Sequence, residues 1–114
     1  MTIYAAPGQP DSLVTVSSRY GHYIGGEWVE PVRGEYFENI SPVNGKPFTE
    51  VGRGTAEDIE AALDAAHAAA EGWARTAPTE RSNVLLKIAD LMEEHLPMLA
   101  VAETWENGKP VRET

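Results

Sequence analysis

The spacing of apolar residues changes near Thr55 and divides the chain into two halves. Before Thr55, short apolar and aromatic runs alternate with turn residues, which is typical of strands. The Gly25-Gly26 pair predicts a tight hairpin turn because paired glycines tolerate a positive φ, and Asn44-Gly45 is a second turn signal. We therefore expect short strands at residues 23–24, 28–29, 36–40 and 48–51.

In the second half, apolar residues recur at steps of three and four, which predicts three amphipathic helices. Thr55 and Asp58 resemble a capping box at the start of the first helix, which is expected to end near Gly72. Pro78 suits the first position of the second helix, and the third is expected to stop at Asn107-Gly108. The stripes expected to be buried are Ile59, Ala62, Leu63, Ala66, Ala70 and Trp73, then Leu85, Ile88, Leu91 and Met92, and finally Met98, Leu99, Ala102 and Trp105.

Strands followed by helices predict an α/β arrangement that a chain of 114 residues does not complete by itself. Three apolar helix faces need a broad partner surface, and a few short strands supply little of one. We therefore expect a fragment whose helix faces stay partly uncovered. Residues 1–19, rich in Pro, Gly, Ser and Thr, are expected to form a flexible arm, and residues 20–114 the structured part.

The net charge and the lack of cysteine limit what the chain binds or catalyses. Nine Lys and Arg stand against 18 Asp and Glu, which gives a formal net charge of -9. Nucleic acid and anionic membrane surfaces are not expected as partners, because both attract basic proteins. The sequence has no bilayer-spanning run and no signal-peptide pattern, so we expect a cytoplasmic location. Without cysteine, the chain has no disulfide, thiolate metal site or thiol nucleophile.

Several motifs occur in an order that resembles one enzyme family. Residues 23–29, Tyr-Ile-Gly-Gly-Glu-Trp-Val, are similar to the opening hairpin of aldehyde dehydrogenases. Residues 41–46, Ser-Pro-Val-Asn-Gly-Lys, resemble the Asn-Pro-Ala-Thr-Gly-Glu turn of that family, with Ser41 in place of the usual Asn. Residues 103–110, Glu-Thr-Trp-Glu-Asn-Gly-Lys-Pro, are similar to its Glu-Thr-Leu-Asp-Asn-Gly-Lys-Pro motif. The tryptophan in this last motif looks most like the branch that acts on acetaldehyde and other short aliphatic aldehydes.

The resemblance implies that the chain is the N-terminal portion of an NAD(P)-dependent aldehyde dehydrogenase, an oxidoreductase that converts aldehydes to carboxylic acids. Residues 20–114 would then begin its Rossmann-like cofactor-binding domain, and the parent enzyme would be a homo-oligomer, either a dimer or a tetramer. In this family a cysteine thiolate attacks the aldehyde, hydride passes to NAD or NADP, and a glutamate activates the water that hydrolyses the thioester. That cysteine, that glutamate and the cofactor-binding glycines are expected outside this chain. The chain alone is therefore expected to be inactive and to bind no cofactor.

One metal site of the family carries over to this chain by resemblance. Many members hold a monovalent cation, Na+ or K+, with two backbone carbonyls before the Asn-Pro turn and an acid of the Glu-Thr-Leu-Asp motif. The matching residues here are Asn39, Ile40 and Glu106. Carbonyl and carboxylate oxygens suit a hard cation. The alternative is that Glu106 only occupies the last turn of its helix.

The segment Gly52-Arg53-Gly54 lies before a predicted helix, where backbone N–H groups attract anions. A phosphate loop would have a third glycine at position 57, where this chain has Glu57 followed by Asp58. The two carboxylates would repel a phosphate. We therefore expect a plain strand-to-helix connection rather than a cofactor loop.

The histidines and two of the tryptophans favour structural roles over chemistry. His22, His67 and His95 show no metal-ligand spacing and are expected at the surface. Trp73 and Trp105 fall within the apolar stripes, which favours packing over the stacking of a ligand.

Two further functions stay open at this stage. The chain could act without catalysis as a structural or subunit-association fragment, or as a free-standing helical binding module. A coding sequence that continues beyond codon 114 into a cysteine-containing catalytic part would favour the enzyme.

Overall fold

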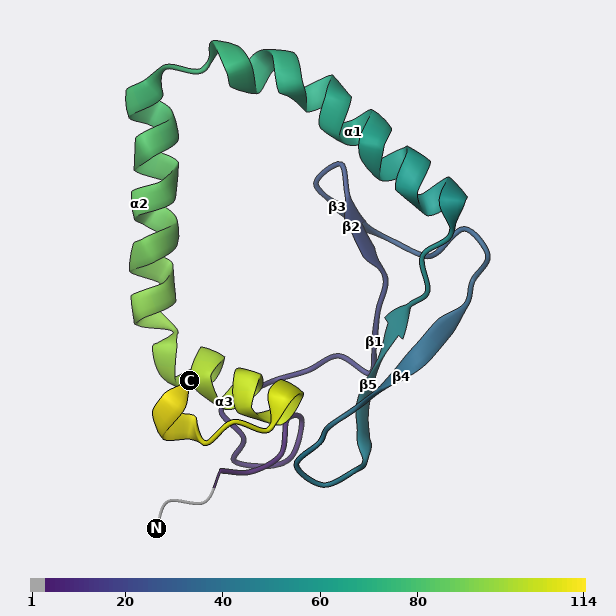
Figure 1. The fold of residues 1–114 in the computed structure, drawn as a ribbon, viewed down its shortest axis with the longest axis vertical. Helices are drawn as coiled ribbons and strands as arrows, with labels where there is room; N and C mark the ends of the chain where they lie inside the picture. Colours follow the sequence, from purple (N-terminus) through teal and green to yellow (C-terminus); the bar gives the residue numbers. More distant parts are fainter. Residues whose placement is uncertain (1–3) are drawn as a thin grey trace.

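The computed structural model describes residues 4–114. Within this range the strands come first and the helices follow, so the expected α/β order is confirmed (Figure 1). The elements are β1 Arg19–Tyr20, β2 His22–Ile24, β3 Glu27–Val29, β4 Tyr36–Ile40, β5 Pro47–Gly52, α1 Ala56–Arg75, α2 Pro78–Glu94, α3 Leu96–Asn107 and the 3-10 turn η1 Val111–Glu113.

The strands form a small sheet and a separate hairpin. In the sheet the order is β1-β5-β4, with β4 antiparallel and β1 parallel to the central strand β5. In the hairpin, β2 pairs antiparallel with β3, and Tyr23 lies opposite Trp28. Gly25 and Gly26 have φ of 62° and 85°, as the tight turn requires. The expected hairpin and the two later strands are confirmed, whereas the sequence pattern did not predict β1.

The helices begin where the sequence predicts. α1 follows Thr55, α2 starts at Pro78, and α3 ends before Gly108, whose φ of 80° is the left-handed conformation that ends many helices. The predicted end of α1 at Gly72 is wrong, because the helix continues to Arg75. A glycine inside a helix costs only about 1 kcal/mol relative to alanine, which the surrounding helical residues tolerate.

Residues 4–18 follow the edge of the sheet through a few hydrogen bonds. The Gly8 N–H donates to the Val14 carbonyl at 2.9 Å, which closes a loop. The Thr49 hydroxyl donates to the Ser17 carbonyl at 2.8 Å, and this contact ties the segment to β5. Residues 1–3 of the expected arm lie outside the described residues, and the division at residues 19 and 20 stays a prediction.

The three helices form an arch from one end of the sheet to the other instead of packing side by side (Figure 1). The radius of gyration is 17.5 Å, whereas a compact domain of this length has about 13 Å. The accessible surface is 8525 Å², compared with about 6,100 Å² for a compact monomer of the same mass. The fold therefore leaves a large part of its surface without a partner.

The predicted burial of the α1 and α2 stripes is wrong within residues 4–114. Leu85, Ile88 and Met92 of α2 are 69%, 43% and 57% exposed, respectively. The buried aliphatic side chains of the described chain are Val14 and Val101. The α1 and α2 stripes are apolar faces that stay largely uncovered in this range, whereas Met98, Ala102 and Trp105 of the α3 stripe are half-buried, so the faces are partly uncovered, as the incomplete layout led us to expect. None of the described helices is both long and apolar enough to cross a membrane.

Candidate functional site

The junction between the end of β4 and the end of α3 contains the residues expected to bind a cation. The Ser41 side chain at this junction is 1% exposed. Its hydroxyl donates to the Trp105 carbonyl at 2.5 Å and accepts a hydrogen bond from the Val43 N–H at 3.2 Å. Because carbonyls in the last turn of a helix lack a helical partner, this hydroxyl caps α3 and fixes it to the sheet.

Two of the three predicted cation ligands are brought into contact by this junction. The Asn39 Nδ2 donates to the Glu106 Oε1 at 2.8 Å, although the two residues are 67 positions apart. A register shift separates Asn39 from Ile40, and Ile40 lies opposite Pro47. Proline has no N–H, so Pro47 donates no ladder hydrogen bond to Ile40. The observed contact to Glu106 is made by the side-chain amide of Asn39 and not by its backbone carbonyl, which was the predicted ligand, so the cation site stays a prediction.

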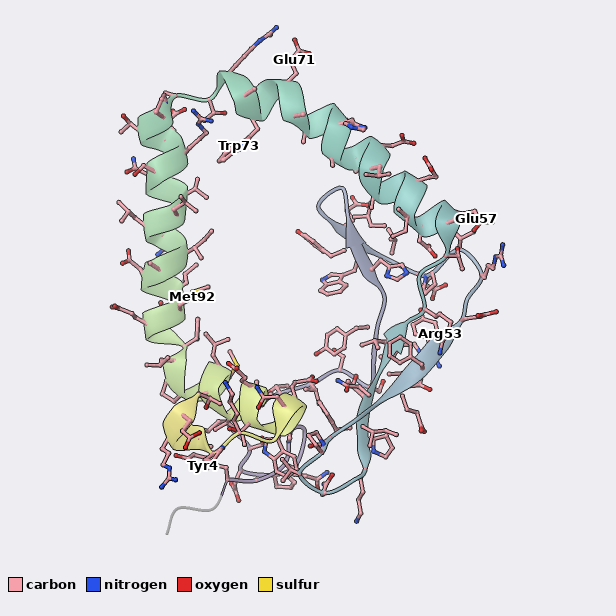
Figure 2. All side chains as sticks on the ribbon, in the orientation of Figure 1. Tyr4, Arg53, Glu57, Glu71, Trp73 and Met92 are labelled. Carbon is pink, nitrogen blue, oxygen red and sulfur yellow. The ribbon has the colours of Figure 1, made fainter. Side chains whose placement is uncertain are left out.

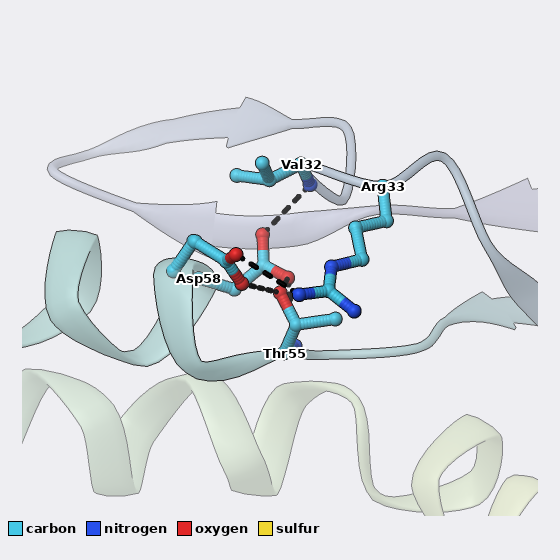
Figure 3. A network of polar contacts seen from close by, with 5 residues as sticks. Val32, Arg33, Thr55 and Asp58 are labelled. Atoms are coloured by element: carbon cyan, nitrogen blue, oxygen red, sulfur yellow. Dashed lines mark hydrogen bonds and ion pairs between the residues drawn. The ribbon is translucent and has the colours of Figure 1, made fainter.

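A second polar cluster lies at the start of α1, where Figure 3 shows the chain's own side chains around the helix N-terminus. Asp58 is 4% exposed. Its Oδ1 accepts the Val32 N–H at 2.9 Å and its Oδ2 accepts the Thr55 N–H at 2.8 Å. These backbone N–H groups hold the pKa of Asp58 below its ordinary value. One carboxylate thus caps the helix and fixes the chain segment that leaves the hairpin.

Glu57 adds an outer layer to this cluster. Its Oε2 lies 2.8 Å from the Thr55 hydroxyl, and its Oε1 lies 3.1 Å from the Arg33 guanidinium. The Thr55 hydroxyl, the Glu57 backbone N–H and Arg33 together lower the pKa of Glu57 to about 2. The hydrogen bond to Glu57 in turn raises the pKa of Arg33. Two carboxylates therefore occupy the helix N-terminus, which makes it a poor site for the phosphate of a dinucleotide.

His22 differs from the sequence expectation of a surface histidine. Its side chain is 21% exposed, and its buried Nε2 lies 3.7 Å from the Asp58 Oδ2 without a hydrogen-bond partner among the described residues. It packs against Gly52, where an added Cβ would lie 3.3 Å from the His22 Cε1. The Pro31 Cγ would lie closer still, at 2.7 Å, so the glycine of β5 makes room for both Pro31 and the imidazole. His67 and His95 are exposed, and residues 4–114 contain no cluster of three or more His, Cys, Asp or Glu that could hold a metal.

The tryptophans have different surroundings. Trp73 is 51% exposed and projects from the inner side of the arch (Figure 2), so its predicted burial is wrong within the described residues. Trp105 is half-buried at the α3 junction. The sequence analysis missed an aromatic cluster in which the ring centroid of Trp28 lies 5.9 Å from that of Tyr20 and 5.3 Å from that of Tyr23. The sequence signal for this cluster was the position of Tyr23 and Trp28 on the two strands of a predicted hairpin, where aromatic residues can pair across the strands.

The chain matches known proteins over most of its length. The profile of the aldehyde dehydrogenase family matches residues 28–114. A probable aldehyde dehydrogenase of Streptomyces coelicolor is 69% identical over the whole chain, and an acetaldehyde dehydrogenase of Pseudomonas aeruginosa is 66% identical over 98% of it. The structure of PnpE in complex with nicotinamide adenine dinucleotide covers 82% of the chain with a TM-score of 0.80 and 34% identity.

These matches cover a small share of the relatives. The chain spans 22% of the length of each of the two bacterial relatives and 19% of the PnpE chain. The resemblance seen in the sequence motifs is therefore confirmed for the family and for the fold, and it concerns about a fifth of the length of those proteins.

Proposed function

The chain belongs to the aldehyde dehydrogenase family, and we propose that it is the N-terminal portion of an NAD(P)-dependent enzyme that oxidises short aliphatic aldehydes to carboxylic acids. The observation that carries this proposal is the 66% identity to an acetaldehyde dehydrogenase over nearly the whole chain. The family match over residues 28–114 supports the reaction type. The finer choice of a short aldehyde rests on that one relative and on the Trp105 motif.

The residues of this chain do not fit the dinucleotide itself. The helix start that follows a glycine pair is filled by the carboxylates of Asp58 and Glu57, both of which have a pKa below the ordinary value. Their negative charge repels a pyrophosphate. We therefore assign NAD(P) binding and the nucleophilic cysteine to parts of the enzyme outside residues 1–114, and we propose that this chain alone is inactive.

The role of this chain would be architectural. Its apolar helix faces, which are uncovered here, offer the surface on which the remaining cofactor-binding domain packs. In this proposal, residues 20–114 form the first part of that domain and residues 1–19 form a flexible arm. The cytoplasmic location and the dimeric or tetrameric state of the parent enzyme belong to the same proposal.

The test compares the full-length natural polypeptide with residues 1–114 alone. NAD(P)H formation is followed by the absorbance of the reduced nicotinamide, with acetaldehyde and with a long-chain aldehyde as substrates. We expect the full-length protein to have a higher kcat/KM for acetaldehyde than for the long-chain aldehyde. Residues 1–114 alone are expected to form no NAD(P)H. A preference for the long-chain aldehyde would refute the substrate choice, and NAD(P)H formation by residues 1–114 would refute the architectural role.

We further propose that Asn39, Ile40 and Glu106 bind Na+ or K+ in the full-length enzyme. The support is local, since the Glu106 carboxylate lies beside the irregular end of β4, where Pro47 donates no hydrogen bond to Ile40. Oxygen ligands of this kind suit a hard monovalent cation. The expected result is that NaCl or KCl raises the melting temperature more than choline chloride does at equal ionic strength.

The matched variants for the cation site are Glu106→Gln and Glu103→Gln. Glu106→Gln is expected to remove the difference between the salts, whereas Glu103→Gln in the same helix keeps it. Equal melting temperatures in all three salts for the unmodified protein would show that no cation binds there.

A further inference from the structure

The tetrapeptide Asn-Gly-Lys-Pro occurs twice in the chain, at residues 44–47 and at residues 107–110. An asparagine followed by glycine is the sequence most prone to spontaneous deamidation, because glycine leaves the attacking backbone nitrogen unhindered. The two copies share the reacting residues and the two residues that follow. A difference in their reactivity must therefore come from the preceding residues or from the fold.

The backbone of the two copies is held in the same way. The Oδ1 of Asn44 accepts the Lys46 N–H at 3.0 Å, and the Oδ1 of Asn107 accepts the Lys109 N–H at 2.9 Å. In both copies the glycine N–H donates to a carbonyl at 2.8 Å. Both glycines have a positive φ, 69° at Gly45 and 80° at Gly108. These contacts affect both sites alike.

The two copies differ in the amide nitrogen that leaves during deamidation. The Nδ2 of Asn107 donates to the Glu103 Oε1 at 3.1 Å, one helical turn earlier, and Asn107 is the last residue of α3. The structure shows no such partner for the Nδ2 of Asn44 within residues 4–114. Both asparagines are exposed, but Asn44 lies in the turn between β4 and β5 and not in a helix. A helical backbone also resists the rotation that brings the side chain over the next nitrogen.

We propose that Asn44 is a site of spontaneous deamidation and that the end of α3 protects the identical motif at Asn107. The Gly45 backbone nitrogen attacks the Asn44 Cγ, so that an N–Cγ bond forms and the Cγ–Nδ2 bond breaks. The glycine N–H proton passes to the solvent, the leaving nitrogen takes up a proton, and ammonia departs. Water then opens the resulting succinimide to aspartate or isoaspartate, and no oxidant or reductant is needed.

The location of Asn44 gives this change a structural consequence. The turn is closed by the Ser41 N–H, which donates to the Lys46 carbonyl at 3.0 Å. Isoaspartate adds a methylene to the main chain inside this turn, and either product adds a negative charge. Since Ser41 also fixes α3 through the Trp105 carbonyl, the modification loosens the junction between the sheet and α3.

The test measures both sites in the same sample of the full chain. The protein is incubated in mildly alkaline buffer, and peptide mass spectrometry with isoaspartate detection follows Asn44 and Asn107 over time. We expect Asn44 to react several-fold faster than Asn107 in native buffer, and the two rates to converge in concentrated urea. Equal rates in native buffer, or a faster reaction at Asn107, would overturn the proposal.

A pair of variants tests the source of the protection. Glu103→Ala removes the partner of the Asn107 amide and is expected to raise the Asn107 rate about twofold, since an exposed i,i+4 pair contributes about 0.5 kcal/mol. Glu94→Ala, an exposed acid of α2, is expected to leave both rates unchanged. An unchanged Asn107 rate in Glu103→Ala would refute the protection by Glu103.

Discussion

The Leu85→Ala substitution tests whether the apolar face of α2 is a packing surface of a larger domain. In this chain Leu85 is 69% exposed. Truncating an exposed leucine in a helix changes the free energy of unfolding by no more than about 0.5 kcal/mol. Truncating a fully buried leucine to alanine lowers the free energy of unfolding by about 2–5 kcal/mol. The same substitution is therefore expected to be almost neutral in residues 1–114 at a dilution that keeps them monomeric, and strongly destabilising in the full-length protein.

The surface of the chain indicates how large the missing partner is. Its 8525 Å² exceed the roughly 6,100 Å² of a compact monomer by about 2,400 Å². A stable interface between two proteins buries about 1,200–2,000 Å² in total. The excess is larger than such an interface, so we also expect residues 1–114 alone to self-associate and to bind hydrophobic dyes.

The assay combines urea unfolding with sedimentation velocity for both lengths of the protein, and small-angle X-ray scattering gives the radius of gyration of residues 1–114. Lys87→Ala, a change of an exposed residue on the same helix, serves as the control and is expected to be neutral in both. An equally small effect of Leu85→Ala in the full-length protein would refute the packing surface. A monomer of residues 1–114 with a radius of gyration near 13 Å would refute the extended arch.

Three further predictions concern the junctions of the fold, measured as the free energy of unfolding of the full-length protein. Ser41→Ala leaves the Trp105 carbonyl without its partner and is expected to cost about 1–3 kcal/mol, whereas the exposed Ser82→Ala is neutral. Gly21→Ala places a Cβ 2.2 Å from the Val29 carbonyl oxygen and is expected to disrupt the hairpin, while Gly72→Ala has open space and should stabilise α1 by about 0.5–1 kcal/mol. Equal changes in the free energy of unfolding for Gly21→Ala and Gly72→Ala would contradict this prediction. The pKa of Glu57, about 2, and the pKa of Asp58 are lower in the folded state than in the unfolded state. The two carboxylates therefore stabilise the fold fully above about pH 5, and this stabilisation is lost as the pH falls toward 2. The double variant Glu57→Gln/Asp58→Asn should flatten this part of a melting-temperature profile, and an unchanged slope would argue against it.

The local structure followed from neighbouring residues. Thr55 and Asp58 cap α1, Pro78 begins α2, and Gly108 ends α3, because each of these signals acts within one helical turn. The strand at residues 36–40 matched its prediction because turn residues bound it on both sides. The continuation of α1 beyond Gly72 was not predictable from this glycine, since a single weak helix former is outweighed by its neighbours.

The contacts that build the candidate sites were decided by the tertiary structure. The Asp58 carboxylate reaches Val32, 26 positions earlier, and the Asn39 amide reaches Glu106 across 67 positions. The parallel pairing of β1 with β5 and the packing of His22 beside Gly52 also join distant segments. Periodicity marks which face of an element is apolar, but it does not say which other element covers that face. In this chain the sequence therefore indicated the family, the three helices and every strand except β1, while the tertiary structure decided which polar groups meet and left the helix faces open, because burial depends on partners that a local pattern does not encode.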